Sequence, residues 1–336
     1  MKGLSLPKGL EFVTNGRGQR LHVRTRLAAS DPSNGRPRGL VLYLHGMHSH
    51  GSRINFTTLA REINSMGFHY AALDFHGHGY SDGHPGVITS HLDLLDDVES
   101  FLSVLYRDPN VERANAPQFH VDAAALDPQS CVFYLLGSSM GGGVALVLAH
   151  MCCSRASPAN ADRYSTACRG CILAAPALQV KLPWFAPSFI VPPLKFIMNW
   201  AVLPLVPSLG LPESTITTSS AATHAIWDTD EYISYVNADA ASFRGALYFK
   251  TLFAIFGLSD AALAAIPQLT HDSMRILVLM DPDDAVTDFA GVQNLQQAAP
   301  IAARGRVSVV QMPRGRHDIL TNRIDDAVEA IAAWLV

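Results

Sequence analysis

The chain has 336 residues, of which 49% are hydrophobic, and it carries a formal net charge of −4. This length allows one large core with an insertion. The slightly acidic balance gives no general attraction to nucleic acid or to anionic membrane surfaces. We therefore expect no nucleic-acid partner.

The cysteines and the N-terminal residues bear on the compartment. The five cysteines form an odd set without the spacing of a zinc site or a disulfide framework. Residues 1–10 contain two lysines and no apolar stretch of signal-peptide length. Both observations favour a cytoplasmic protein with reduced thiols.

The first elements of the chain predict an antiparallel hairpin, with apolar runs at 10–14 and 21–26 around the turn 15–18. After it, short apolar runs alternate with segments long enough for helices. This alternation predicts an α/β fold with a mostly parallel central sheet and helices on both faces. The runs lie at 39–44, 69–75, 131–136, 170–175, 275–280 and 306–312.

The third of these runs leads directly into Gly137-x-Ser139-x-Gly141 and then into a helix-forming stretch. A match of three residues in five also occurs by chance in a chain with 24 glycines, but a preceding strand and a following helix are typical of a nucleophile elbow. The two glycines give room to the strained turn. We predict that Ser139 is a nucleophile and that the Met140 amide donates to an oxyanion.

The interval before the run at 275–280 is far longer than a crossover helix requires. We predict an inserted cap at 179–270, which divides the core into 1–178 and 271–336. Within it, 182–211 is strongly apolar, but its prolines break it into pieces too short to cross a bilayer as one helix. It fits a lid over an apolar pocket, with Trp184 and Phe185 as candidate substrate contacts, and an apolar lid can also make peripheral contact with a membrane surface. The alternative is a plainly buried packing segment.

A serine nucleophile needs a histidine base and a carboxylate that orients it, and both follow the serine in this order of elements. The run at 275–280 ends in a carboxylate-rich loop, where we favour Asp284 over Asp283 and Asp281. The run at 306–312 leads to His317, which we predict to be the general base. Active groups of open α/β sheets gather at such strand ends.

A second oxyanion donor is expected after an earlier strand. The run at 39–44 is followed by His45-Gly46-Met47, a turn that can expose the Met47 amide. We take His45 and Ser138 as further candidates for substrate contact.

These segments together resemble the α/β-hydrolase superfamily and, within it, the monoacylglycerol lipase and lysophospholipase branch. The similarity spans residues 10 to 334 and is weakest in the cap. It implies hydrolysis of a lipid ester by Ser139, Asp284 and His317 without any cofactor. The segments that carry it are 45–53, 74–83, 173–178 and 316–320.

The chain departs from that branch at two positions that bear on substrate choice. Histidine is common where this chain has Ser138, and a small residue is common where it has Met47. Monoacylglycerol is the expected substrate, with a lysophospholipid, a general carboxylic ester or acyl transfer as alternatives within the fold. Oligomeric state is left open.

Two readings from other classes compete with this one. The first is a metallohydrolase, because imidazoles at close spacing can bind zinc; no recognised zinc pattern is complete, so we expect no metal. The second is a non-catalytic binding protein of the same fold, which usually lacks the nucleophile or the base. The histidines in question are His45, His48, His50, His76, His78 and His84.

Overall fold

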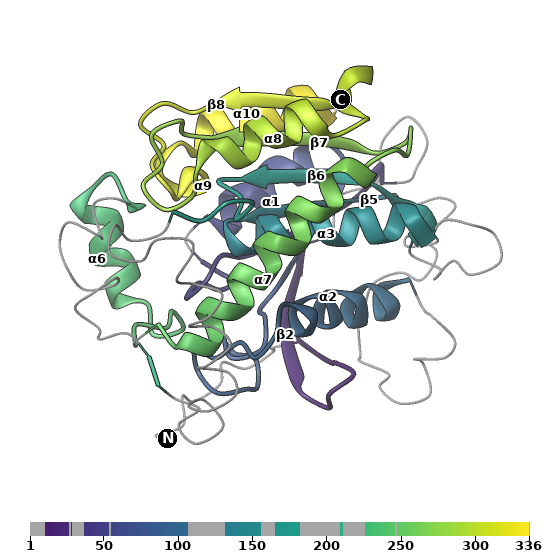
Figure 1. Ribbon diagram of the computed structural model, residues 1–336. Helices are drawn as coiled ribbons and strands as arrows, with labels where there is room; N and C mark the ends of the chain where they lie inside the picture. Colours follow the sequence, from purple (N-terminus) through teal and green to yellow (C-terminus); the bar gives the residue numbers. More distant parts are fainter. Residues whose placement is uncertain are drawn as a thin grey trace.

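The computed structural model describes residues 11–26, 28, 37–53, 55–106, 132–155, 165–181, 209–210, 226–245 and 247–335. At its centre lies an eight-stranded sheet in the order β1-β2-β4-β3-β5-β6-β7-β8 (Figure 1). The strands are β1 (Glu11–Thr14), β2 (Arg20–Arg26), β3 (Gly39–Leu44), β4 (Phe68–Leu73), β5 (Phe133–Ser138), β6 (Cys168–Ala174), β7 (Arg275–Met280) and β8 (Val307–Gln311).

The pairing confirms the predicted α/β-hydrolase fold. Strands β1 and β2 form the expected antiparallel hairpin, β2 also pairs antiparallel with β4, and all other neighbours are parallel. The predicted run at 39–44 coincides with β3, but β5 ends two residues later than the predicted run at 131–136. The carboxyl ends of β3, β5, β7 and β8 therefore bring the predicted site residues to one edge of the sheet.

Helices cover both faces of the sheet because successive strand residues point to opposite sides. In β3, Leu40, Leu42 and Leu44 join the core beneath α2, α3, α7 and α8, while Val41 and Tyr43 join the core beneath α1 and α10. Figure 1 shows the first group of helices in front of the sheet. The helices are α1 (Phe56–Ser65), α2 (His91–Leu105), α3 (Met140–Arg155), α6 (Asp230–Ala238), α7 (Phe249–Ala265), α8 (Phe289–Ala298), α9 (Ile319–Asn322) and α10 (Ile324–Leu335).

The predicted cap at 179–270 is described only in part. Helix α7 contributes Ala254, Leu258 and Ala262 to the main core, whereas α6 has no buried residue. The apolar helical stretch Phe249–Gln268 has the length and composition of a membrane span, but half of it is buried in the protein, as in a core helix. Most of the apolar segment 182–211, with Trp184 and Phe185, lies outside the described residues, so the domain division and the lid remain predictions.

Candidate active site

Ser139 lies on a sharp turn between β5 and α3 whose geometry depends on its neighbours. Its φ is +52°, a left-handed conformation that is strained for a residue with a side chain. A Cβ on Gly137 would stand 2.2 Å from the Gly141 carbonyl oxygen, and one on Gly141 would stand 2.1 Å from the Leu44 carbonyl oxygen. The turn can form only because both positions are glycine.

Backbone hydrogen bonds hold the turn from the side of β6. The Ser139 amide donates to the Ala174 carbonyl at 2.9 Å, and the Ser139 carbonyl accepts from the Ala177 amide at 2.9 Å. The serine is thus fixed by main-chain contacts to the neighbouring strand end.

Three predicted side chains from three separate elements meet at this point. His317 Nε2 lies 2.8 Å from Ser139 Oγ, and His317 Nδ1 lies 2.8 Å from Asp284 Oδ2. The imidazole is therefore within hydrogen-bond distance of the hydroxyl on one side and of the carboxylate on the other. This is the order of contacts that general-base activation of a serine requires.

Asp284 is the carboxylate that reaches the imidazole. It is fully buried, whereas Asp283 is exposed. Burial raises the pKa of Asp284, but the hydrogen bond and charge of His317, with donors from Val286 and Thr287, outweigh burial and hold that pKa below its usual value. The carboxylate is consequently ionised at neutral pH and fixes which ring nitrogen of His317 carries the proton.

Two backbone amides flank the serine at the predicted oxyanion positions. Met140 is the first residue of α3, where amides have no partner within the helix and the helix dipole is positive. Gly46, which precedes Met47, lies so close to the turn that a Cβ there would be 3.2 Å from Ser139 Cβ. Within the described residues, neither the Met47 nor the Met140 amide donates to another group. Both therefore remain candidates for an oxyanion hole.

His45, a candidate for substrate contact from the sequence, has a supporting place in the structure. It is fully buried, with Nδ1 2.7 Å from the Gly46 carbonyl oxygen and Nε2 accepting from the Phe75 amide at 3.0 Å. Burial and the nearby His78 lower the pKa of His45 to about 3, so the ring is neutral. Both nitrogens are engaged, and the residue holds the turn before Met47 against the end of β4.

Asp74 links two loops that the sequence placed apart, and its role was missed. Its carboxylate accepts from the Gly51 amide at 2.6 Å and from the Tyr80 amide at 3.0 Å, and it lies 2.8 Å from His22 Nδ1. Burial raises the pKa of Asp74, but His22 and the neighbouring imidazoles lower it below the usual value. The loop at 74–83 thus supports the segment 45–53, which carries Met47 and which we call the Met47 loop.

Asp281, considered above as an alternative acid, instead anchors the loop that carries His317. Its Oδ2 accepts from the Arg316 amide at 2.8 Å. That loop contains Arg314 and Arg316 at φ of +63° and +52°, so it needs contacts that hold a strained backbone. The sequence shows that Asp281 directly follows β7. It does not show the strained backbone at Arg314 and Arg316 that this carboxylate holds.

The other residues predicted from the sequence are the candidate substrate contacts and the clustered histidines. Ser138 ends β5 and is buried, and Trp184 and Phe185 lie outside the described residues. Within the described ranges, no group of three or more histidine, cysteine or acidic side chains is arranged to hold a metal ion. The His78 ring instead packs against those of His45 and His48, with ring centroids 5.3 and 6.5 Å away.

The fold and the site together define an α/β-hydrolase. More particularly, the chain belongs to the Hydrolase_4 family, described as serine aminopeptidase, S33, which it matches over residues 35–323. It is 24% identical over 324 residues to the monoglyceride lipase of Rattus norvegicus, covering 96% of this chain and 87% of the relative.

Solved structures agree in fold. A soluble variant of monoglyceride lipase from Saccharomyces cerevisiae, in complex with a substrate analog, has a TM-score of 0.67 at 17% identity and covers 100% of this chain and 94% of that one. A thermostable carboxyl esterase from Bacillus coagulans, in complex with glycerol, has a TM-score of 0.67 at 17% identity, with 97% of each chain covered.

Proposed function

We propose that this ester hydrolase cleaves monoacylglycerols through a covalent acyl-enzyme on Ser139, with His317 as general base and Asp284 as the carboxylate that orients it. The hydrogen-bonded series Ser139, His317 and Asp284, with both distances at 2.8 Å, carries the proposal. A serine hydroxyl is a poor nucleophile near neutral pH, so this contact with an imidazole is what makes it reactive.

In the first half-reaction, Ser139 Oγ attacks the ester carbonyl carbon while His317 Nε2 takes the hydroxyl proton. The negative charge on the carbonyl oxygen is then stabilised by the Met47 and Met140 amides, and each such donor contributes on the order of 10²–10³ in rate. His317 gives the proton to the glycerol oxygen, the carbon–oxygen bond breaks, and the alcohol leaves.

In the second half-reaction, a water molecule takes the place of the alcohol. His317 removes its proton as it attacks the acyl carbon, and then returns the proton to Ser139 as the fatty acid leaves. No step requires a redox change.

Two observations support a monoacylglycerol over other esters. Rat monoglyceride lipase aligns with nearly the whole chain, and the yeast monoglyceride lipase shares the fold over the full length of this chain. The esterase from Bacillus coagulans has the same TM-score as the yeast enzyme, which makes a general carboxylesterase the second candidate. A lysophospholipase and an acyltransferase use the same first half-reaction.

The test has two arms. In the first, a serine-directed phosphonate labels the wild-type protein but not Ser139→Ala, and the variant loses esterase activity; labelling or full activity in the variant overturns the assignment of Ser139. In the second, hydrolysis is compared across glycerol esters of increasing chain length, lysolipids and short aryl esters. The highest kcat/KM on a glycerol ester supports the proposed substrate, and a preference for lysolipids or aryl esters replaces it.

A further inference from the structure

Asp318, directly after His317, holds a buried ionic contact that the reaction scheme does not use. The residue is only 6% exposed. Oδ2 accepts from Arg53 Nη2 at 2.7 Å and from the Trp227 indole Nε1 at 2.8 Å. Burial raises the pKa of Asp318, but the Arg53 charge and these donors outweigh burial and hold that pKa below its usual value. An ionised carboxylate therefore lies at the junction of three segments.

The first partner, Arg53, connects Asp318 to the loop that carries Met47. Arg53 is itself buried, and its Nη1 donates to Ser49 Oγ at 3.2 Å. The Ser49 amide in turn donates to the Gly46 carbonyl at 3.2 Å. The ion pair thus joins the loop of the general base to the loop of one oxyanion donor.

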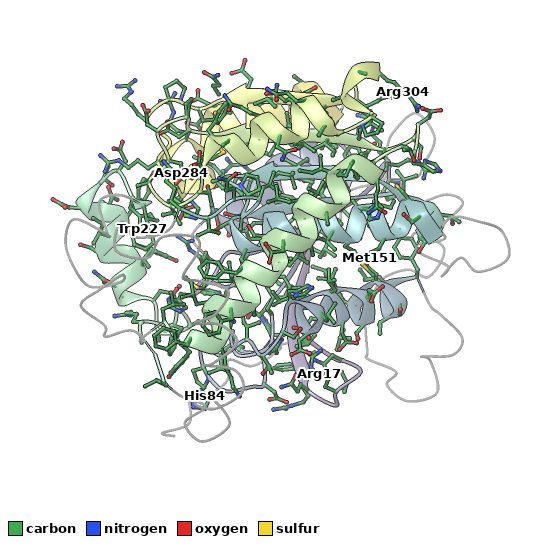
Figure 2. All side chains as sticks on the ribbon, viewed as in Figure 1. Arg17, His84, Met151, Trp227, Asp284 and Arg304 are labelled. Carbon is green, nitrogen blue, oxygen red and sulfur yellow. The ribbon has the colours of Figure 1, made fainter. Side chains whose placement is uncertain are left out.

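The second partner, Trp227, belongs to the segment 226–245 that contains α6. The Ile226 carbonyl also accepts from the Asp318 amide at 3.3 Å and from Asn322 Nδ2 at 2.8 Å. In Figure 2, Trp227 and Asp284 lie at the same end of the molecule. The beginning of this segment is therefore docked on the His317 loop.

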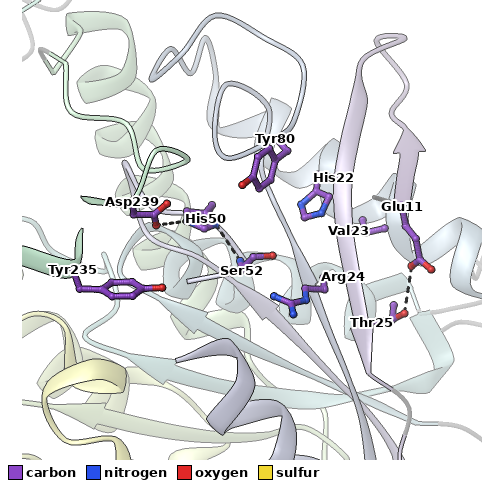
Figure 3. A pocket seen from close by; sticks show the side chains of 10 residues that line it. All are labelled: Glu11, His22, Val23, Arg24, Thr25, His50, Ser52, Tyr80, Tyr235 and Asp239. Carbon is purple, nitrogen blue, oxygen red and sulfur yellow. Dashed lines mark hydrogen bonds and ion pairs between the residues drawn. The ribbon is translucent and has the colours of Figure 1, made fainter. Parts of the chain in front are cut away.

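The other end of the segment docks on the Met47 loop. Asp239 Oδ2 lies 2.6 Å from His50 Nε2 (Figure 3), and the Phe243 amide donates to the His48 carbonyl at 3.2 Å. Helix α6 between the two ends has no buried residue, so polar contacts at its ends, not an apolar face, hold it. Both ends terminate beside groups of the proposed reaction.

We propose that Asp318 is a positioning residue. Through Arg53 and Trp227 it holds the His317 loop, the Met47 loop and the segment 226–245 in one arrangement. This inference rests on the proposed function of Ser139, His317 and Asp284. A buried ion pair gives little net stability, because desolvation offsets the attraction, but it is directional and holds its partners in one geometry. Misplacing a reacting group by about 1 Å costs about 10²-fold in rate. Loss of these contacts should therefore lower kcat more than it raises KM.

The test uses Asp318→Asn, which removes the charge at nearly constant volume, and Trp227→Phe, which removes one donor. We expect kcat to fall about 10- to 100-fold in Asp318→Asn and about threefold in Trp227→Phe, with KM changed less than twofold in each. The double variant should lose less than the product of the single losses, because both changes break the same contact. Trp334→Phe is the matched control, since Trp334 packs in α10 and touches Tyr134 and Arg275 rather than the site.

All variants are compared as folded monodisperse protein, with melting temperature measured in parallel. A kcat in Asp318→Asn or Trp227→Phe within twofold of Trp334→Phe, or a double variant with multiplicative losses, overturns the proposal. If Asp318→Asn does not fold, Trp227→Phe alone decides by its kcat. Failure of the reaction scheme is seen separately, as esterase activity that survives in Ser139→Ala.

Discussion

Ser139 lies on a turn held by glycines and main-chain hydrogen bonds, whereas His317 lies on a loop held by side chains from distant parts of the chain. At the turn, added Cβ atoms on Gly137 or Gly141 would meet carbonyl oxygens at 2.2 and 2.1 Å. At the loop, the contacts come from Asp281, Asp284 and the Arg53–Asp318 pair. The turn is therefore specified locally, and the loop is specified only after the fold has formed.

The largest expected effect distinguishes Asp284, which contacts His317, from its neighbour Asp283. Asp284→Asn keeps the shape of the side chain but removes the charge that fixes the His317 tautomer, so kcat should fall about 10³- to 10⁴-fold. Asp283→Asn changes an exposed side chain, whereas Asp284 is the one at hydrogen-bond distance from His317, so this variant should stay within about twofold of wild type. Steady-state kinetics on one ester measure both; equal losses would mean that the orienting carboxylate has been misassigned.

The turn can be broken without touching a reacting group. Gly141→Ala places a Cβ against the Leu44 main chain, which cannot move aside, and should cost about 3 kcal/mol or more in unfolding free energy. Gly143→Ala is the control, because the nearest atoms to its Cβ would belong to the Leu258 side chain, at 3.0 Å, and not to the main chain, and should cost about 1 kcal/mol. Urea denaturation gives both values, and similar losses would argue against main-chain specification of the turn.

Acid should act on the loops around the turn through buried neutral imidazoles. Burial lowers the pKa of His78 to about 4 from its ordinary 6.5. The unfolded chain therefore binds a proton below pH 6.5 that the folded chain refuses until about pH 4, so stability is lost as pH falls through this window.

At pH 5 this single residue accounts for about 2 kcal/mol of the loss. His78→Asn, which retains a donor for the His76 carbonyl, should flatten the fall in unfolding free energy between pH 7 and pH 5 by about that amount. His271→Asn, at an exposed position, is the control and should leave the slope unchanged. An unchanged slope in His78→Asn would mean that the folded chain protonates this imidazole as readily as the unfolded chain does.

The smallest expected effect concerns Asp281, which holds the His317 loop through the Arg316 amide. Asp281→Asn retains an acceptor for the Arg316 amide but weakens it, so kcat should fall about 10-fold, or about 1.4 kcal/mol. Kinetics beside Asp284→Asn test this. A loss in Asp281→Asn as large as that in Asp284→Asn would make Asp281 part of the reacting set.

Much of this architecture was predictable because its signals are local. Two apolar runs around a turn predicted the hairpin, the alternation of later runs with helix-length segments predicted the parallel sheet, and β3 lies where the run at 39–44 placed it. The strand ends are not local in this sense. Strand β5 continues through Gly137 and Ser138, where the sequence predicts a turn, because pairing with β6 extends the strand. The contacts of His45 were also hidden, because nothing local shows that both of its ring nitrogens are engaged.

The sequence by itself determined the sheet, the strained serine turn and the residue types of a hydrolytic site, since periodicity, glycine spacing and strand ends depend on near neighbours. Only the tertiary structure decided which of three nearby aspartates reaches His317, and that Asp281 and Asp318 instead hold its loop. Those roles depend on distances between residues far apart in the chain, such as the 265-residue separation of Arg53 and Asp318. Such distances exist only once the sheet has brought the strand ends together.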